Sequence, residues 1–101
     1  MAIFTNFLKQ EVPPKKFELS QNDPNPFKVK TTIKYSVPYK TKVMITINNS
    51  DGHIIEKLIS EKQEAGVYEI EFYADGLPKG TYFYHLMADD CFKSREMELI
   101  K

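Results

Sequence analysis

The stretch VYEIEFYADGLPKGTYFYHL, residues 67–86, decides the fold class, because it contains two alternating segments separated by a turn. In the first segment Tyr68, Ile70 and Phe72 alternate with glutamates, the pattern of a strand with one face in a core and one in solvent. The second segment is apolar on both faces, which favours a central strand. Glycine and proline between them are turn formers. This stretch therefore predicts two strands and no helix.

The same period of two recurs on both sides of this stretch, whereas the helical period of 3.6 does not. Upstream, Pro38 closes one alternating run because proline lacks a ladder donor, and Asp51-Gly52 follows the next run as a tight hairpin turn. KFELS, residues 16–20, reads as one further short strand, and Met97 and Leu99 continue the pattern to the C-terminus. The predicted core comprises Ile33, Tyr35, Val43, Ile45, Ile47, Tyr68, Ile70, Phe72, Tyr82, Tyr84 and Leu86.

The segment HIIEKLI, residues 53–59, fits the alternation less cleanly, since Ile55 and Leu58 are three residues apart. Either a β-bulge intervenes, or Ile54 and Leu58 share the inward face. The register of this strand stays open at this point.

About seven short strands, with turn signals every ten or so residues, predict an all-β fold, an immunoglobulin-like antiparallel β-sandwich over residues 17–101. Residues 1–16 are expected to be a loosely ordered N-terminal extension, because they lack alternation and Pro13-Pro14 disfavours continuous pairing.

The segment NDPNPF, residues 22–27, connects the short upstream strand to the next one. Pro24 and Pro26 fix their own backbone angles and push the residues before them toward extended geometry, so the connection is stiff. Phe27 can then plug the end of the core.

The composition of the 101 residues favours neither nucleic acid nor a membrane as partner. Fourteen basic residues balance fourteen acidic ones, so no overall field selects an anionic surface. Cys91 is the single cysteine and cannot form an internal disulfide or a thiolate metal site. The sequence contains neither a secretory signal nor a transmembrane run.

The residues capable of chemistry are scattered, which predicts a protein that is not an enzyme and uses no cofactor or metal. His53 and His85 lack the HxH or HExxH spacing of a metal site, and no serine lies in a G-x-S-x-G context. Asp89-Asp90 could hold calcium only if a distant loop converged on them.

Three tyrosines, Tyr68, Tyr82 and Tyr84, could be imagined as a stacking platform for a sugar or a nucleic acid. Tyrosines at strand spacing are more often core, and we expect these to be core.

The order of these pieces carries more information than any one of them. The chain resembles the C-terminal sorting domain of type IX secretion cargo, which is related to the immunoglobulin-like domain of the flagellar hook-capping protein. The match spans about residues 17–101 and runs from QN before PNPF, through a T-x-I-x-Y strand ending in proline and G-x-Y, to L-P-x-G-x-Y-x-Y. The matching residues are Leu19, Gln21, Asn22, Pro24, Asn25, Pro26, Phe27, Thr32, Ile33, Tyr35, Pro38, Gly52, Gly66, Tyr68, Phe72, Leu77, Pro78, Gly80, Tyr82 and Tyr84.

The resemblance implies an address label that partner proteins of the outer-membrane translocation machinery read, carried by a larger cargo that travels from the periplasm to the cell surface or the medium. Lys93, Arg95 and Lys101 are the candidate partner-binding residues, on the expectation that they form the polar face and tip of the closing strand. The alternative is a structural or adhesive sandwich of a surface protein, including a carbohydrate-binding one.

Overall fold

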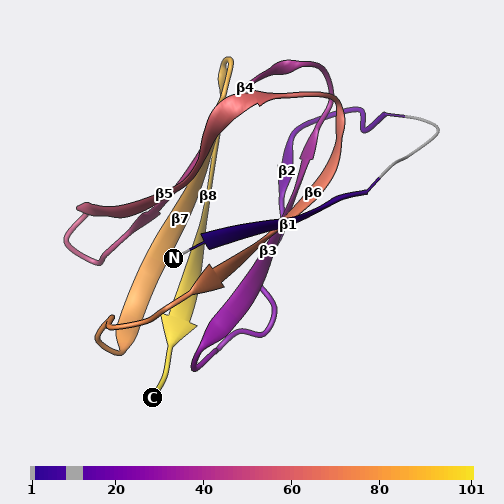
Figure 1. The fold of residues 1–101 in the computed structure, drawn as a ribbon. Helices are drawn as coiled ribbons and strands as arrows, with labels where there is room; N and C mark the ends of the chain where they lie inside the picture. The colour runs from indigo at the N-terminus through magenta and orange to yellow at the C-terminus, as the bar shows by residue number, and fades with distance from the viewer. Residues whose placement is uncertain (1, 9–12) are drawn as a thin grey trace.

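The computed structural model describes residues 2–8 by their backbone and residues 13–101 in full. Eight strands in these ranges form two layers that face each other (Figure 1). The strands are β1 (Ala2–Leu8), β2 (Glu18–Leu19), β3 (Lys30–Val37), β4 (Thr41–Asn48), β5 (Ile54–Gln63), β6 (Gly66–Tyr73), β7 (Gly80–Ala88) and β8 (Cys91–Leu99). The described ranges contain no helix, and hence no helical segment long and apolar enough to cross a bilayer.

The strands pair antiparallel in two four-stranded sheets. The first sheet has the order β1-β6-β3-β2, and the second has the order β5-β4-β7-β8. If β1 is set aside, β2 to β8 correspond in order to the seven strands of an immunoglobulin constant domain. The first, second and fifth of these (β2, β3 and β6) then share the first sheet, and the third, fourth, sixth and seventh (β4, β5, β7 and β8) share the second. An immunoglobulin constant domain differs only in placing its fourth strand with the first sheet. The predicted all-β antiparallel sandwich is confirmed.

The core lies between the two sheets and is built from the inward positions of the alternating strands. Every residue of the predicted core is buried, and β7 lies in the interior of its sheet, as its two apolar faces indicated. Phe27 also plugs the core as predicted, with 2% of its surface exposed and its ring edge against Phe72. The alternation therefore located the core positions of β3, β4, β6 and β7.

The register of β5 resolves the alternatives that the sequence left open. Ile45 pairs with Ile59 and Thr46 pairs with Lys57, so the pairing skips Leu58, and a second shift skips Ile55. These shifts turn Ile59 inward, at 9% exposed, and leave Ile54 56% exposed. The bulge reading is correct, and the reading in which Ile54 shares the inward face is wrong.

The lack of alternation predicted no strand before residue 16, whereas Ala2–Leu8 pair with β6 at the edge of the first sheet. A register shift between Phe4 and Asn6 interrupts this pairing, which explains why the segment shows no strict alternation. Strand geometry does not report how readily a strand opens, so the loose attachment of residues 1–16 stays a prediction.

Candidate functional site

The two sheets meet along one long edge of the sandwich, where β2 and β8 are the outer strands and contact each other. Three side chains bridge this edge. The Arg95 guanidinium donates from Nε to the Leu19 carbonyl at 2.9 Å, and the Tyr84 hydroxyl donates to the Ser20 carbonyl at 2.6 Å. Gln21 Nε2 donates to the Glu96 carbonyl at 2.7 Å. These bonds hold the two layers together without extending either sheet.

The Tyr84 hydroxyl is a reliable donor in this bridge because its environment keeps it protonated. The side chain is fully buried, and burial raises the pKa of Tyr84 to about 12, with the nearby Arg95 charge acting in the opposite direction.

The proline segment continues the bridge toward the C-terminus of β8. Asn25 Oδ1 accepts a bond from the Glu98 backbone N–H at 3.0 Å, and the Phe27 N–H donates to the Glu98 carbonyl at 3.0 Å. The Ile100 N–H donates to the Phe27 carbonyl at 2.8 Å. The peptide bonds before Pro24 and Pro26 are both cis. The outer edge of β8 is therefore covered from Glu96 to Ile100.

A buried polar cluster supports the proline segment from inside. Asn22 is 3% exposed, and its Nδ2 donates to the Pro24 carbonyl at 3.1 Å and to Thr31 Oγ1 at 3.0 Å. The Thr31 hydroxyl, itself buried, donates to the same Pro24 carbonyl at 2.8 Å. Sequence reasoning missed this role, because the turn preference of asparagine indicates a loop but not burial.

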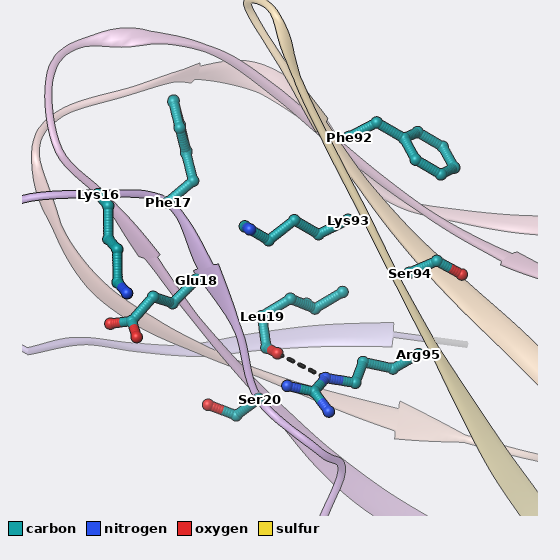
Figure 2. A pocket seen from close by; sticks show the side chains of 9 residues that line it. All are labelled: Lys16, Phe17, Glu18, Leu19, Ser20, Phe92, Lys93, Ser94 and Arg95. Carbon is teal, nitrogen blue, oxygen red and sulfur yellow. Dashed lines mark hydrogen bonds between the residues drawn. The ribbon is translucent and has the colours of Figure 1, made fainter.

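Beyond Arg95 the bridge stops, and the two strands bound a groove of about 440 Å³. Residues 16–20 form one wall and residues 92–95 form the other. Figure 2 shows Lys93 reaching into this groove from β8, while Phe92 points away from it. The lining carries three basic side chains, Lys16, Lys93 and Arg95, against the single acidic side chain of Glu18. The groove is thus a basic, solvent-open site.

The structure brings Lys93 and Arg95 together in this groove but places Lys101 elsewhere. Lys101 lines a separate hollow with Lys28 and Asp75. It follows Lys93 by eight residues, which is about 27 Å of extended chain at about 3.4 Å per residue. The three residues therefore do not form one contiguous patch.

The orientation of Lys93 and Arg95 differs from the expected polar face of the strand. Arg95 pairs with Tyr84 and Met97 pairs with Tyr82, both of which point into the core, so Lys93 and Arg95 share the inward face with Met97. They are nevertheless exposed, because β2 is only two residues long and does not cover them.

Two predicted motif tyrosines share one structural role. The Tyr68 hydroxyl donates to the Glu64 carbonyl at 2.7 Å, and the Tyr82 hydroxyl donates to the Pro78 carbonyl at 2.6 Å. Each tyrosine ties its strand to the turn four residues before it, as the tyrosine corner of immunoglobulin-like sandwiches does. Both rings are about 95% buried, so they belong to the core and offer no stacking platform.

The glycines of the motifs lie at strand starts and in a turn. Gly66 and Gly80 begin β6 and β7, and Gly52 has a φ of +88° in the β4–β5 turn. This turn is held by Asn49, whose carbonyl accepts from the Gly52 N–H and whose Oδ1 accepts from the N–H groups of Asp51 and His53. The predicted hairpin is confirmed.

The other candidate chemical groups make separate contacts in residues 13–101. No cluster of three His, Cys, Asp or Glu side chains suited to a metal is found there. Asp89 accepts a bond from the Tyr39 hydroxyl at 2.5 Å. His85 lies on the outer face of β7 under the Phe92 ring, with ring centroids 5.2 Å apart.

Comparison with known protein families finds a match over most of the chain. The model of a family described as the secretion system C-terminal sorting domain matches residues 24–98, which is well over half of the chain. This range runs from the proline segment to the covered end of β8. No curated protein matches the chain.

Proposed function

Because the chain belongs to the family of secretion system C-terminal sorting domains, we propose that it acts as a non-catalytic recognition module of type IX secretion. Partner proteins of the outer-membrane translocation machinery read the folded domain and so export the cargo that carries it. The cargo passes from the periplasm to the cell surface or the medium.

The family assignment carries this proposal, and the basic groove supplies the surface to be read. Lys93 and Arg95 are exposed on a strand that is otherwise paired and buried at its C-terminal end. A rigid sandwich holds them in place, which favours recognition by a partner over catalysis. Lys101, two residues beyond the end of β8, acts as a second contact.

The competing role is that of a structural or adhesive sandwich of a surface protein. One observation favours it, the exposure of Phe92, at 61%, on the outer face of the second sheet. An adhesive role needs neither a translocation partner nor the basic residues of the groove, so export of a reporter separates the two functions.

The test fuses residues 1–101 behind a signal peptide and a folded reporter in a bacterium that carries the type IX machinery. We expect the unchanged fusion to reach the surface or the medium. Replacement of Lys93, Arg95 and Lys101 by alanine is expected to trap a folded fusion in the periplasm. A matched control replaces three exposed lysines of β4 and β5, Lys42, Lys57 and Lys62, and is expected to be exported.

Thermal unfolding of each purified variant shows whether the domain is folded, since Arg95 also bonds the Leu19 carbonyl. Arg95→Lys keeps the positive charge but loses the guanidinium geometry that bonds the Leu19 carbonyl. It therefore separates the contribution of the charge to export from the contribution of this bond to folding. An unchanged, stably folded fusion that stays in the periplasm would contradict the sorting role and favour the adhesive one.

A further inference from the structure

We propose that the outer edge of β8 at Phe92–Ser94 accepts an extended segment of a partner protein as an added strand, in which acidic and apolar side chains alternate. This inference rests on the proposed function and names the chemistry of the partner that the basic groove recognises. Strand addition to a free sheet edge is an established mode of peptide recognition, in which backbone bonds give affinity and alternate side chains give specificity.

The backbone of β8 offers donors and acceptors on this edge. The groups bonded to residues 21–27 are the carbonyl of Glu96, the N–H and carbonyl of Glu98 and the N–H of Ile100. Even-numbered residues therefore direct their backbone away from β7, and the two-residue period of a strand extends this to Phe92 and Ser94. Within residues 13–101, no bond to the outward groups of Phe92 and Ser94 is found.

The free part of the edge is short and sharply bounded. Residues 21–27 cover the edge of β8 only as far as Glu96, which Gln21 contacts. The short strand β2 pairs with Tyr35 and Ser36 of β3 and not with β8. The free segment presents four outward backbone groups, the N–H and carbonyl of Phe92 and of Ser94, so an added strand can form up to four backbone bonds with it. The opposite edge of this sheet, β5, is interrupted by two register shifts, which makes it a poorer template.

The groove side of this edge selects acidic side chains. Lys93 and Arg95 project into the groove and Lys16 lines its other wall, with Glu18 as the only acidic residue of the lining. Inward-pointing charges of this kind discourage apolar and like-charged strands from pairing with an edge. A strand with carboxylates on that face gains opposite-charge pairs instead.

The other side of the edge selects apolar side chains. Phe92 is 61% exposed and stacks on His85, and its cross-strand neighbours on this outer face are Met87 and then Met44. A strand added beside β8 places alternate residues against Phe92 on this face, because its side chains alternate as well. The occupant therefore alternates acidic residues toward the groove with apolar residues toward Phe92.

The test uses a capped hexapeptide that alternates glutamate and valine, titrated into the full chain at low ionic strength and followed by amide NMR. We expect the Phe92 and Ser94 amides to shift and to exchange more slowly with solvent. Ser94→Pro removes an outward donor, so we expect about tenfold weaker binding, while Ser94→Ala binds like the unchanged protein. A peptide that alternates lysine and valine is expected to bind at least tenfold more weakly.

A second probe keeps the test decisive if Ser94→Pro does not fold. Methylation of the backbone nitrogens on one edge of the glutamate peptide removes its pairing donors and leaves its charge, and we expect it not to bind. Equal binding of the methylated peptide overturns strand addition, and equal binding of the lysine peptide overturns the preference for acidic side chains. If exchange of the Phe92 and Ser94 amides slows as the protein concentration rises without any peptide, the strand that occupies the edge is a second copy of this chain. That result overturns the proposal of an acidic partner segment.

These outcomes are separate from those of the export test, because no translocation machinery takes part in the titration. Loss of peptide binding with continued export of the unchanged fusion overturns strand addition and leaves the sorting role standing. Export of the Ser94→Ala fusion together with retention of a folded Ser94→Pro fusion supports both.

Discussion

Asn22 shows how a single polar residue can carry a motif in a β-sandwich. Its amide is buried and satisfies the Pro24 carbonyl and Thr31 Oγ1, and it accepts a bond from Gln21 Nε2 at 2.7 Å. Gln21 bonds in turn to Glu96 on β8. One buried side chain thus links the proline segment, the first sheet and the second sheet, which explains why Gln-Asn precedes Pro-Asn-Pro-Phe.

We expect Asn22→Ala to lower the free energy of unfolding by about 1–3 kcal/mol, since it leaves buried groups without their partners. Asn25→Ala is the matched control. Asn25 is exposed and accepts one bond, from Glu98, so its loss is expected to cost about 1 kcal/mol or less. Urea unfolding measures both, and equal effects of the two changes would contradict the buried role of Asn22.

His85 gives the domain a pH-dependent contribution to stability. Desolvation lowers the pKa of His85 in the folded state, and its Nδ1 is buried without a hydrogen-bond partner in the described part of the chain. Thr46 and Ser94 pair with His85 on the neighbouring strands. The charged residues nearby in register on this face are Lys57, which pairs with Thr46, and Glu96, which pairs with Phe83.

Well above the ordinary histidine pKa of about 6.5 the imidazole is neutral in both states, and its contribution to stability is complete. As the pH falls below that value, the unfolded chain takes up a proton that the folded chain resists, so the free energy of unfolding falls. We expect His85→Gln to flatten this decline as the pH falls through the ordinary histidine pKa of about 6.5. Replacement of the exposed His53 by glutamine is the control, and a decline that persists in His85→Gln contradicts this cause.

At the scale of the strands, alternation located β3, β4, β6 and β7 because their inward and outward environments differ strongly. It failed where pairing is irregular. The two register shifts in β5 depend on which residues of β4 lie opposite it, and the shift in β1 depends in the same way on β6. In both strands the shift breaks the alternation of inward and outward residues. A bulge is a property of a strand pair, so a single segment of sequence does not specify it.

The register of β5 can be tested by truncating two isoleucines. We expect Ile59→Ala to lower the free energy of unfolding by about 2–4 kcal/mol, because Ile59 lies in the core. Ile54→Ala removes the same atoms from an exposed position and is expected to change it by about 0.5 kcal/mol or less. The reverse order of the two effects would show that the bulges are misplaced.

The edge strand β1 is expected to open before the rest of the domain. It pairs with β6 alone, and its register is interrupted. Amide exchange of residues 3–7 should therefore be much faster than exchange of residues 68–72 of the same ladder. Protection of residues 3–7 equal to that of β6 would rule out a loosely attached N-terminal segment.

At the scale of the molecule, segments far apart in the sequence build the groove. Lys16–Ser20 and Phe92–Arg95 meet because the first and last strands of residues 17–101 lie at the same edge of the sandwich. The sequence singled out Lys93 and Arg95 but could not show that β2 leaves them uncovered. Nor could it show that the covered part of β8 ends at Glu96, since that boundary depends on the Gln21 contact.

Completion of the core requires β8, which supplies Met97 and Leu99, both fully buried. We expect a chain that ends at Asp90 to lack a cooperative unfolding transition, because Tyr82, Tyr84 and Leu86 lose the strand that covers them. A chain that ends at Ile100 keeps these contacts and the bond to Phe27, and is expected to fold. Circular dichroism and thermal melts of the two chains check this, and a cooperative melt of the shorter chain would contradict it.

The contacts between the proline segment, residues 22–27, and the C-terminal end of β8 also make folding depend on how far the chain has been synthesised. The residues that join Phe27 and Asn25 to the strand lie at Glu98 and Ile100, more than seventy positions further along the chain. A polypeptide that ends before Glu98 therefore cannot form these contacts. Only a polypeptide synthesised as far as Ile100 forms the covered edge of β8, so the folded edge reports that translation has passed that position.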